Sequence, residues 1–322
     1  MNIVYTVCNR SELPQAIALS TSVKKQHPEA QMIIGWVDEA PVPALPEGIV
    51  RLSVKLINIP DWPAMYERYY DFELVAACRP WFARYLVSQY PDCTTLTFLS
   101  PSTYLYQPLP LGEYPEAELL LTAHLTQPLP AVQGIDDKRI LNIGMYHSNA
   151  WVLRPTVATK SFLSWWANRT LDRAAFDLCH GMCLDQLWLN YAPLLVPNTK
   201  IISQPGWHMG LHSMAFGALR EVNGGFKSGE YSLLSFDFAG LGSFHPIWSD
   251  HQQLVINNQL FGRLYQNYKT ELEKWKLYKI GGQASFGKIP VRKKYRSLRK
   301  GIVTNLKKVL THIDQFELNQ TN

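Results

Sequence analysis

The sequence predicts an α/β fold in which a central, mostly parallel sheet is flanked by helices. The chain begins with NIVYTVCN at residues 2–9, a β-branched run typical of a buried strand. Apolar residues then recur at spacings of three and four over residues 13–28, a helical pattern that stops at Pro28. A second buried-strand run, AQMIIGWVDE, follows at 30–39. Strand, helix and strand in this order begin a doubly wound sheet, which binds ligands at the carboxyl ends of its strands.

The same alternation continues along the chain. The pattern predicts further strands at 50–59, 94–106, 118–125, 146–155 and 231–240, and helices at 72–87, 159–175 and 260–280. Pro80 lies within the pattern of 72–87, so it must stand near the start of that helix or kink it. From the usual size of domains we expect one domain at 1–265 and a helical, basic extension at 266–322.

Composition places the chain among folded proteins. Of its 322 residues, 47% are hydrophobic and 18% are charged, which excludes a disordered composition. No apolar run reaches the roughly 18 residues of a membrane span, and the N-terminus lacks the pattern of a signal peptide, so we expect a cytoplasmic protein. The five cysteines are odd in number and scattered, which predicts reduced thiols. Cys179-His180-x-x-Cys183 has no matching second pair, so packing is favoured there over zinc binding.

Positive charge is concentrated near the C-terminus. The net charge is +5, and the segment at 288–308, KIPVRKKYRSLRKGIVTNLKK, contains nine Lys and Arg residues and no acid. Such a segment suits an anionic surface such as a membrane leaflet or a lipid-linked phosphate, and a solvated helix end explains it equally well. A nucleic-acid partner is not expected, because the segment offers no aromatic stacking platform beyond Tyr295.

A motif at 98–109, FLSPSTYLYQPL, consists of an apolar run, a polar break at Ser100-Pro101-Ser102 and a second apolar run. Together with other segments in a common order, it resembles the GT-A-type bacterial glycosyltransferases, close to the family 8-like group. The resemblance spans residues 1–295, and its carriers include TVCN, FELVAACRPWFARYLV, LNIGMYHSNAWVLRP, GMCLDQLWLN, PGWHMGLH and SFDFAG. It implies a GT-A-like (Rossmann-like) catalytic domain that binds a nucleotide sugar.

The resemblance also implies roles for particular residues. Arg79 would supply a cation near the diphosphate, and the segment from Asn142 to Gly144 would line the donor sugar or acceptor side. Asp185 and Gln186, expected in the first half of a short helix, would read donor hydroxyls and contact the anomeric centre. The residues implied at the base or ribose of the donor are Thr6, Val7, Cys8 and Asn9.

Three positions depart from the family pattern. Family members usually hold a divalent metal with two aspartates one residue apart and a histidine in a His-x-x-Gly pattern. Here Ser100 and Ser102 replace the aspartates, and the pattern reads Asp237-Phe238-Ala239-Gly240. Serine hydroxyls do not supply the charge that a hard cation requires. We therefore expect no bound divalent metal and no cofactor, the nucleotide sugar being a substrate.

Without a metal, side chains must stabilise the charge on the departing nucleoside diphosphate. Arg79 is the best candidate because arginine stays charged and can bind two phosphate oxygens, although an ordinary helix-surface arginine is an equal alternative. A hydrogen-bonded structural role is favoured for His208 and His212. The full set of candidate cations is Arg10, Arg79, Arg84, His208, His212 and His245.

Two hypotheses on function follow. The leading one is a metal-independent hexosyltransferase that uses a nucleotide sugar, with a UDP-sugar expected, and a bacterial glycan or protein as acceptor. The alternative is a catalytically inactive GT-A-like binding or scaffold protein. Asp136 or Asp137 could serve an inverting enzyme as general base, whereas a solvated loop carboxylate is the commoner fate. Family 8 favours retention, so the stereochemistry stays open.

Overall fold

A computed structural model describes residues 1–126, 128, 137–214, 219–242, 244–255, 258–289 and 296–314. The chain forms two compact units, Met1–Lys288 and Ile289–Asn322, which are described separately below. The boundary expected after residue 265 falls within helix α7 (Gln259–Lys274) of the first unit.

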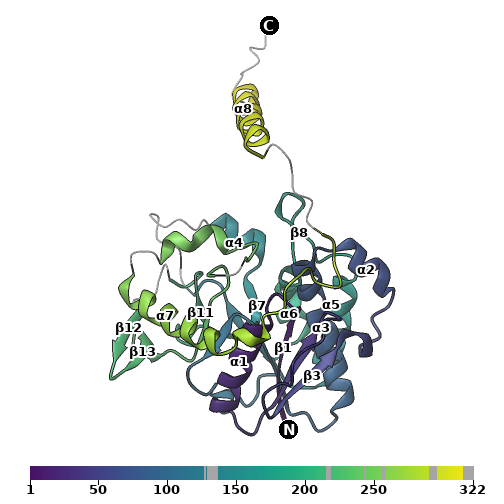
Figure 1. Cartoon of the computed structure of the whole chain (residues 1–322), viewed down its shortest axis with the longest axis vertical. Coiled ribbons are helices and arrows are strands. Elements are labelled where there is room, and N and C mark those ends of the chain that lie inside the picture. Colours follow the sequence, from purple (N-terminus) through teal and green to yellow (C-terminus); the bar gives the residue numbers. More distant parts are fainter. Residues whose placement is uncertain are drawn as a thin grey trace. The chain divides into compact units, whose positions relative to one another are not determined.

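The first unit is built on a seven-stranded sheet (Figure 1). Four of its six strand pairs are parallel, and β7 is antiparallel to both of its neighbours. The predicted α/β fold with a mostly parallel central sheet is therefore confirmed. In spatial order the strands are β10 (Thr199–Ile202), β6 (Leu119–Ala123), β7 (Tyr146–Leu153), β4 (Thr95–Leu99), β1 (Asn2–Cys8), β2 (Gln31–Trp36) and β3 (Ile49–Ser53).

Helices cover both faces of this sheet. Helix α1 (Leu13–Gln26) packs on one face, and α3 (Asp71–Gln89) and α5 (Val157–Thr170) pack on the other. Side chains of β1 alternate between the two hydrophobic clusters, so that Tyr5 and Val7 lie on the α3 side and Cys8 on the α1 side. A strand covered on both faces must be apolar throughout, which is why NIVYTVC reads as a continuous run.

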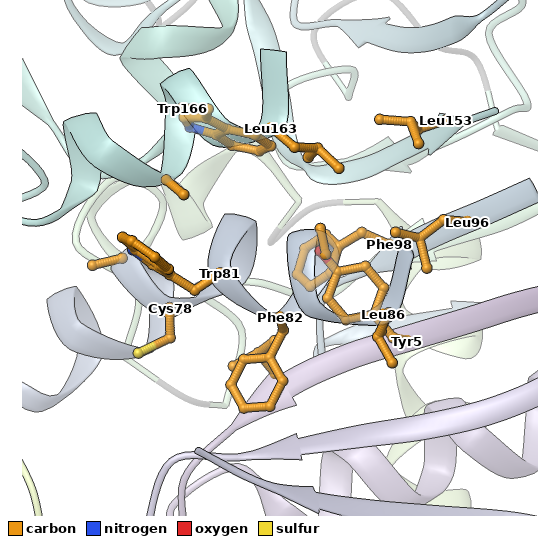
Figure 2. Packing of buried hydrophobic residues seen from close by; sticks show 14 of the residues in the cluster. Tyr5, Cys78, Trp81, Phe82, Leu86, Leu96, Phe98, Leu153, Leu163 and Trp166 are labelled. Carbon is orange, nitrogen blue, oxygen red and sulfur yellow. The ribbon is translucent and has the colours of Figure 1, made fainter. Parts of the chain in front are cut away.

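Helix α3 packs beside α5 on the same face of the sheet (Figure 2). Its residues Trp81 and Phe82 belong to the same buried cluster as Phe98 of β4 and Trp166 of α5. Contact with the sheet is close, because a Cβ atom on Gly35 of β2 would lie 2.9 Å from the Phe82 ring. Pro80 lies at the middle of α3 and not at its start.

The break expected at Ser100-Pro101-Ser102 is a turn between two sheets. After β4 ends at Leu99, the chain enters β5 (Thr103–Leu105), which pairs antiparallel with β15 (Ser235–Asp237) in a small second sheet. The Thr103 amide donates to the Ser100 carbonyl at 3.0 Å, and the Phe238 amide donates to the Ser102 carbonyl at 2.9 Å. The turn therefore brings Asp237 next to the two serines.

Short elements complete the first unit. The segment predicted as a helix around Asp185 is instead a 3-10 helix at Gln186–Tyr191, preceded by a short strand. The remaining helices and strands are α2 (Trp62–Arg68), α4 (Asp137–Ile143), α6 (Ala192–Leu195), β8 (Phe176–Asp177), β9 (Met182–Cys183), β11 (Met209–Gly210), β12 (Leu219–Val222), β13 (Gly225–Ser228) and β14 (Tyr231–Ser232).

The second unit contains one helix in its described part, α8 (Arg296–Asp314). Across the described ranges of both units, no helix combines the length and the apolar character that crossing a bilayer requires.

Candidate functional site

Buried polar residues gather where β1 and β4 end and β7 begins. Because β7 runs antiparallel to β4, with Ala150 opposite Leu99, its first residues lie beside the carboxyl end of β4. Ser100 and Ser148 are each 2% exposed there. This is the edge at which parallel sheets bind their ligands.

The two serines of the turn contact Asp237 through a hydrogen-bond network. The Oγ atoms of Ser100 and Ser102 lie 2.9 Å apart, and Ser102 Oγ donates to Asp237 Oδ1 at 2.6 Å. The Ala239 amide also donates to Oδ1 at 3.0 Å, and Asn149 Nδ2 donates to Oδ2 at 2.8 Å. Three donors thus stabilise the Asp237 carboxylate, which is 2% exposed.

Asn149 joins this network to a buried ion pair. Its Oδ1 accepts from Arg79 Nη1 at 3.2 Å, and the same Nη1 donates to Ser148 Oγ at 3.0 Å and contacts Asp185 Oδ1 at 3.4 Å. Sequence reasoning did not identify Asn149. The signal was present in the pair Ser148-Asn149, which interrupts the apolar run of strand β7.

Arg79 is not an ordinary helix-surface arginine, because it is 8% exposed. Its guanidinium lies over the Phe98 ring, with the CZ atom 5.1 Å from the ring centroid, and it pairs with Asp185, which is fully buried. Burial raises the pKa of Asp185 to about 6, although Arg79 and Ser148 lower it. The charge of Arg79 is therefore already compensated within the protein.

Both polar atoms of the Gln186 side-chain amide form hydrogen bonds within the protein. Its Nε2 donates to the Ile143 carbonyl at 2.8 Å, and its Oε1 accepts from the Ser148 amide at 3.3 Å. It therefore fixes the start of β7 against the end of α4. Trp166 donates to the Asp185 carbonyl at 2.9 Å and fixes the preceding residue.

Four buried histidines pack beside Asp237. The ring centroids of His124 and His147 lie 3.7 Å apart, and those of His147 and His212 lie 3.9 Å apart. His208 Nε2 lies 3.9 Å from Asp237 Oδ2. Of these histidines, sequence reasoning selected only His208 and His212, because the other two are brought in by β6 and β7.

Burial lowers the pKa of all four histidines. The pKa of His124 falls to about 3, and those of His147 and His212 fall well below the usual value because neighbouring imidazoles add to the effect of burial. For His208, Asp237 partly offsets the lowering. These imidazoles are therefore neutral near pH 7 in the protein as described.

Several buried polar atoms of this region have no hydrogen-bond partner among the described residues. Buried polar atoms are normally paired, so such atoms point to a partner that binds there, either water or a ligand. The unpartnered atoms are Thr6 Oγ1, Arg79 Nε, His124 Nε2, His147 Nδ1, His147 Nε2, Asp185 Oδ2 and His208 Nε2.

Glu12 is a further carboxyl group near the site, and sequence reasoning gave it no role. Burial raises its pKa to about 7, with opposing effects from Arg79, which lowers it, and from Asp71 and Asp237, which raise it. His245 interacts electrostatically with two of the same residues. Burial lowers the pKa of His245 to about 4, Asp237 raises this pKa and Arg79 lowers it.

Thr6 to Cys8, expected in a loop, form the end of β1, and Asn9 follows the strand; this segment is buried, and only part of it can offer side chains. Val7 and Cys8 belong to the hydrophobic clusters on opposite faces of the sheet, so their side chains are used in packing. Asn9 Oδ1 accepts from the Ser11 amide at 2.9 Å and from Ser11 Oγ at 2.6 Å. Thr6 Oγ1, near the end of β1, has no hydrogen-bond partner among the described residues.

The Arg10 guanidinium already forms hydrogen bonds within the protein, to Asp38 and Ser285. Its Nη2 donates to Asp38 Oδ1 at 2.6 Å and to Ser285 Oγ at 2.8 Å, and its Nε donates to Asp38 Oδ2 at 2.8 Å. Arg10, Ser285 and the Ala40 amide together hold the pKa of Asp38 below its usual range, against the effect of burial. Arg10 therefore ties the end of β2 to the segment near Ser285.

Other predicted residues lie apart from the hydrogen-bond network. Asn142 and Asp137 are exposed on α4, and Asp136 lies outside the described residues. Arg84 is exposed on α3 and lines a surface pocket of about 410 Å³ with Lys160 of α5. Their functional roles remain predictions.

Gly240 is required by its backbone. Its φ is +83°, and a Cβ atom there would lie 2.6 Å from the carbonyl carbon of Trp248. The tight turn that it permits follows Asp237 directly and lets the Ala239 amide reach the carboxylate.

The donor set near Asp237 does not fit a divalent metal. Both carboxylate oxygens already accept hydrogen bonds, Oδ1 from the Ser102 hydroxyl and Oδ2 from the Asn149 amide. In the described part of the chain, no group of three or more His, Cys, Asp or Glu side chains is arranged to hold a metal ion. The histidine rings also pack against one another instead of converging on one point.

Comparisons with known proteins give limited likenesses. No family model matches the chain. The uncharacterized protein YfnF of Bacillus subtilis (strain 168) is 25% identical over 279 residues, covering 81% of this chain and 89% of YfnF. The structure of the galactosyltransferase LgtC in complex with donor and acceptor sugar analogs is 14% identical to this chain, with a TM-score of 0.47. The match covers 93% of this chain and 99% of the LgtC chain. A glycosyltransferase involved in the glycosylation of the major capsid of PBCV-1 is 7% identical, covers 80% and 100%, and has a TM-score of 0.42.

Proposed function

We propose that this protein transfers a hexose from a nucleotide sugar, a UDP-sugar in our proposal, to a glycan or protein acceptor. The observation that carries the proposal is the connected polar network from Ser102 through Asp237 and Asn149 to Arg79 and Asp185, at the ligand-binding edge of the sheet. Its unpartnered buried atoms suit a substrate with many hydroxyl groups, because each hydroxyl can both donate and accept a hydrogen bond.

In this proposal the parts of the donor contact different elements. Thr6 at the end of β1 faces the nucleoside, and Asp185, with its unpartnered Oδ2, accepts from the hexose hydroxyls. Gln186 acts by positioning, because its amide is fully used in holding the start of β7.

We further propose that the nucleoside diphosphate departs without a metal ion and that protonated histidines stabilise its charge. Arg79 is compensated by Asp185, and the histidines are neutral, so the free site holds little uncompensated positive charge. A bound diphosphate would raise the pKa of neighbouring imidazoles, as any nearby anion does. His208 and His245 would then take up protons and stabilise the leaving group.

A donor panel tests this proposal. The protein is incubated with nucleotide sugars in the presence of Mn²⁺ and then of a chelator, while nucleoside diphosphate release and thermal stability are followed. We expect release that survives the chelator and is lost in Asp237→Asn. The Glu116→Gln variant, at an exposed position with no proposed role, serves as the control and keeps full activity. Absence of any response to every donor would overturn the enzyme hypothesis, and dependence on Mn²⁺ would overturn metal independence.

Proton uptake gives a second, independent readout. Donor affinity should rise as the pH falls from 8 to 6, because binding is linked to protonation. Calorimetric titrations in two buffers of different ionisation enthalpy measure the number of protons directly. Binding without proton uptake would exclude His208 and His245 from the proposed role.

A second candidate function is a GT-A-like protein that binds a nucleotide, glycan or partner without chemistry. The observation that favours it is that the Arg79, Asp237 and Arg10 charges are all satisfied within the protein. It predicts thermal stabilisation by a donor or nucleotide with no release of nucleoside diphosphate over long incubation.

The proposed reaction also implies a cellular location and binding partners. A transferase acting on a bacterial surface glycan would meet its acceptor at the cytoplasmic face of the membrane. We propose that the basic C-terminal segment makes a peripheral contact with that face and that the protein does not bind nucleic acid.

A further inference from the structure

Helix α8 carries one apolar face that is exposed to solvent. Its large apolar side chains recur at steps of three and four, which places them on one side of a helix with 3.6 residues per turn. Each of them is between 51% and 63% exposed. These residues, called the apolar strip below, are Leu298, Ile302, Val303, Leu306, Val309, Leu310 and Ile313.

The opposite side of α8 is polar and positively charged. Lys307, Lys308 and Thr311 are exposed there, away from the centre of the apolar strip. The helix sequence from 296 to 313 contains five Lys and Arg residues and no acid. The helix therefore combines an apolar strip with a cationic face, which is the pattern of helices that lie in a membrane interface.

We infer that α8 lies in the plane of an anionic membrane surface, with the apolar strip inserted at the boundary of the acyl chains and its lysines at the lipid phosphates. This inference rests on the proposed function, whose peripheral contact it specifies by orientation and by residue.

Charge complementarity favours a membrane over a second copy of the chain. Helices that pair in water bury their apolar strips against each other and place opposite charges at the edges. Two copies of α8 would bring only positive charges together across such a contact, because the first acid of the helix is Asp314 at its end. An anionic lipid surface can bury the apolar strip among its acyl chains and pair the lysines with its phosphates at the same time.

Vesicle binding by the full-length protein tests the inference, with no sugar donor present. The probes are vesicles of phosphatidylcholine alone and vesicles that also contain phosphatidylglycerol. We expect binding to the anionic vesicles only, and we expect added salt to weaken it. Equal binding to both kinds of vesicle, or to neither, would overturn the inference.

Two variants separate the charged face from the apolar strip. Each lysine near an anionic surface contributes enough to change the affinity about fivefold, so Lys307→Gln with Lys308→Gln should weaken binding about 25-fold. Leu306→Gln with Leu310→Gln removes two inserted side chains and should weaken binding at least as strongly. Thr311→Gln, on the polar side, should bind as the unaltered protein does.

A matched control excludes an effect of net charge alone. Lys276→Gln with Lys279→Gln removes the same two charges from exposed positions of the first unit. Unchanged binding by this variant supports α8 as the contact, whereas an equal loss would overturn it.

The alternative partner gives a different result. If α8 instead pairs with a second copy, the protein is a dimer in light scattering, Leu306→Gln with Leu310→Gln makes it a monomer, and vesicles are not bound. That outcome overturns the membrane inference. The vesicle assay uses no donor, so its failure leaves nucleoside diphosphate release unaffected, and a failed donor panel leaves vesicle binding unaffected.

Discussion

The guanidinium Nη1 of Arg79 lies 3.4 Å from Asp185 Oδ1, and both residues of this ion pair are buried. It connects the middle of α3 to the residue before the 3-10 helix, 106 positions further along the chain. A buried ion pair adds little net stability, but removal of one partner leaves an uncompensated charge. The pair therefore positions the polar network more than it stabilises the fold.

This geometry predicts a large stability effect for Arg79. Arg79→Met should lower the free energy of unfolding by about 3–5 kcal/mol, because Asp185 is left buried without its cation. Adding Asp185→Leu should recover much of that loss. Urea denaturation measures both, with Arg84→Met on the exposed side of α3 as the control. A loss no larger than that of Arg84→Met would show that the pair is dispensable.

Ser102 offers a test of why this site lacks a second carboxylate. Ser102→Asp would replace the hydroxyl that donates to Asp237 at 2.6 Å with a like charge. We expect the melting temperature to fall in the presence of a chelator, since two carboxylates at this distance repel each other.

Mn²⁺ should restore part of that stability in Ser102→Asp, because a divalent cation can bridge two carboxylates. The unaltered protein should show the same melting temperature with Mn²⁺ and with chelator. A Mn²⁺ response in the unaltered protein would contradict the proposed metal independence.

Glu12 predicts a loss of stability as the pH rises. Its pKa in the folded protein is about 7, above its ordinary value of 4.5, so the stability contributed by its neutral form is fully present below pH 4.5 and is lost as the pH rises to 7. Glu12→Gln removes that loss and should raise the free energy of unfolding at pH 8 by about 2 kcal/mol, with no gain at pH 4.5. Thermal melts at both pH values measure this, and a gain of equal size at both would assign the effect to packing.

The histidine cluster predicts acid sensitivity. Burial and the neighbouring histidines hold the pKa of His147 well below 6.5, so its neutral form contributes stability above that pH which is lost as the pH falls. Between pH 7.5 and 5 the unaltered protein should lose about 2 kcal/mol through this residue. His147→Leu, which breaks no hydrogen bond of the ring among the described residues, should lack that loss.

The control for His147→Leu is His312→Gln, because His312 is exposed on α8. Its pH profile of unfolding should match that of the unaltered protein. Parallel profiles for all three proteins would show that His147 binds protons equally in the folded and the unfolded protein, which would contradict a lowered pKa in the fold.

The strand and helix pattern was readable from the sequence for a local reason. Apolar spacing over a few residues decides whether a segment is covered on one face or on both, and this predicted β1, α1 and β2 in order. The motif at Ser100-Pro101-Ser102 was likewise visible, because a polar turn between two apolar runs must lie at the end of a strand. The short helix expected around Asp185 is present, but it starts at Gln186 as a 3-10 helix that runs directly into α6; its 3-10 form leaves no periodic signal in the sequence.

The sequence by itself determined the α/β alternation, the polar turn with Ser100 and Ser102 at the end of a strand and the basic C-terminal segment. The tertiary structure decided which charges meet. It paired Arg79 with Asp185, placed Asn149 between Arg79 and Asp237, and gathered four histidines from β6, β7 and the region before β15. The physical reason is that these contacts depend on the antiparallel register of β7 beside β4, which joins residues far apart in the chain. Spacing along one segment carries no information about that register.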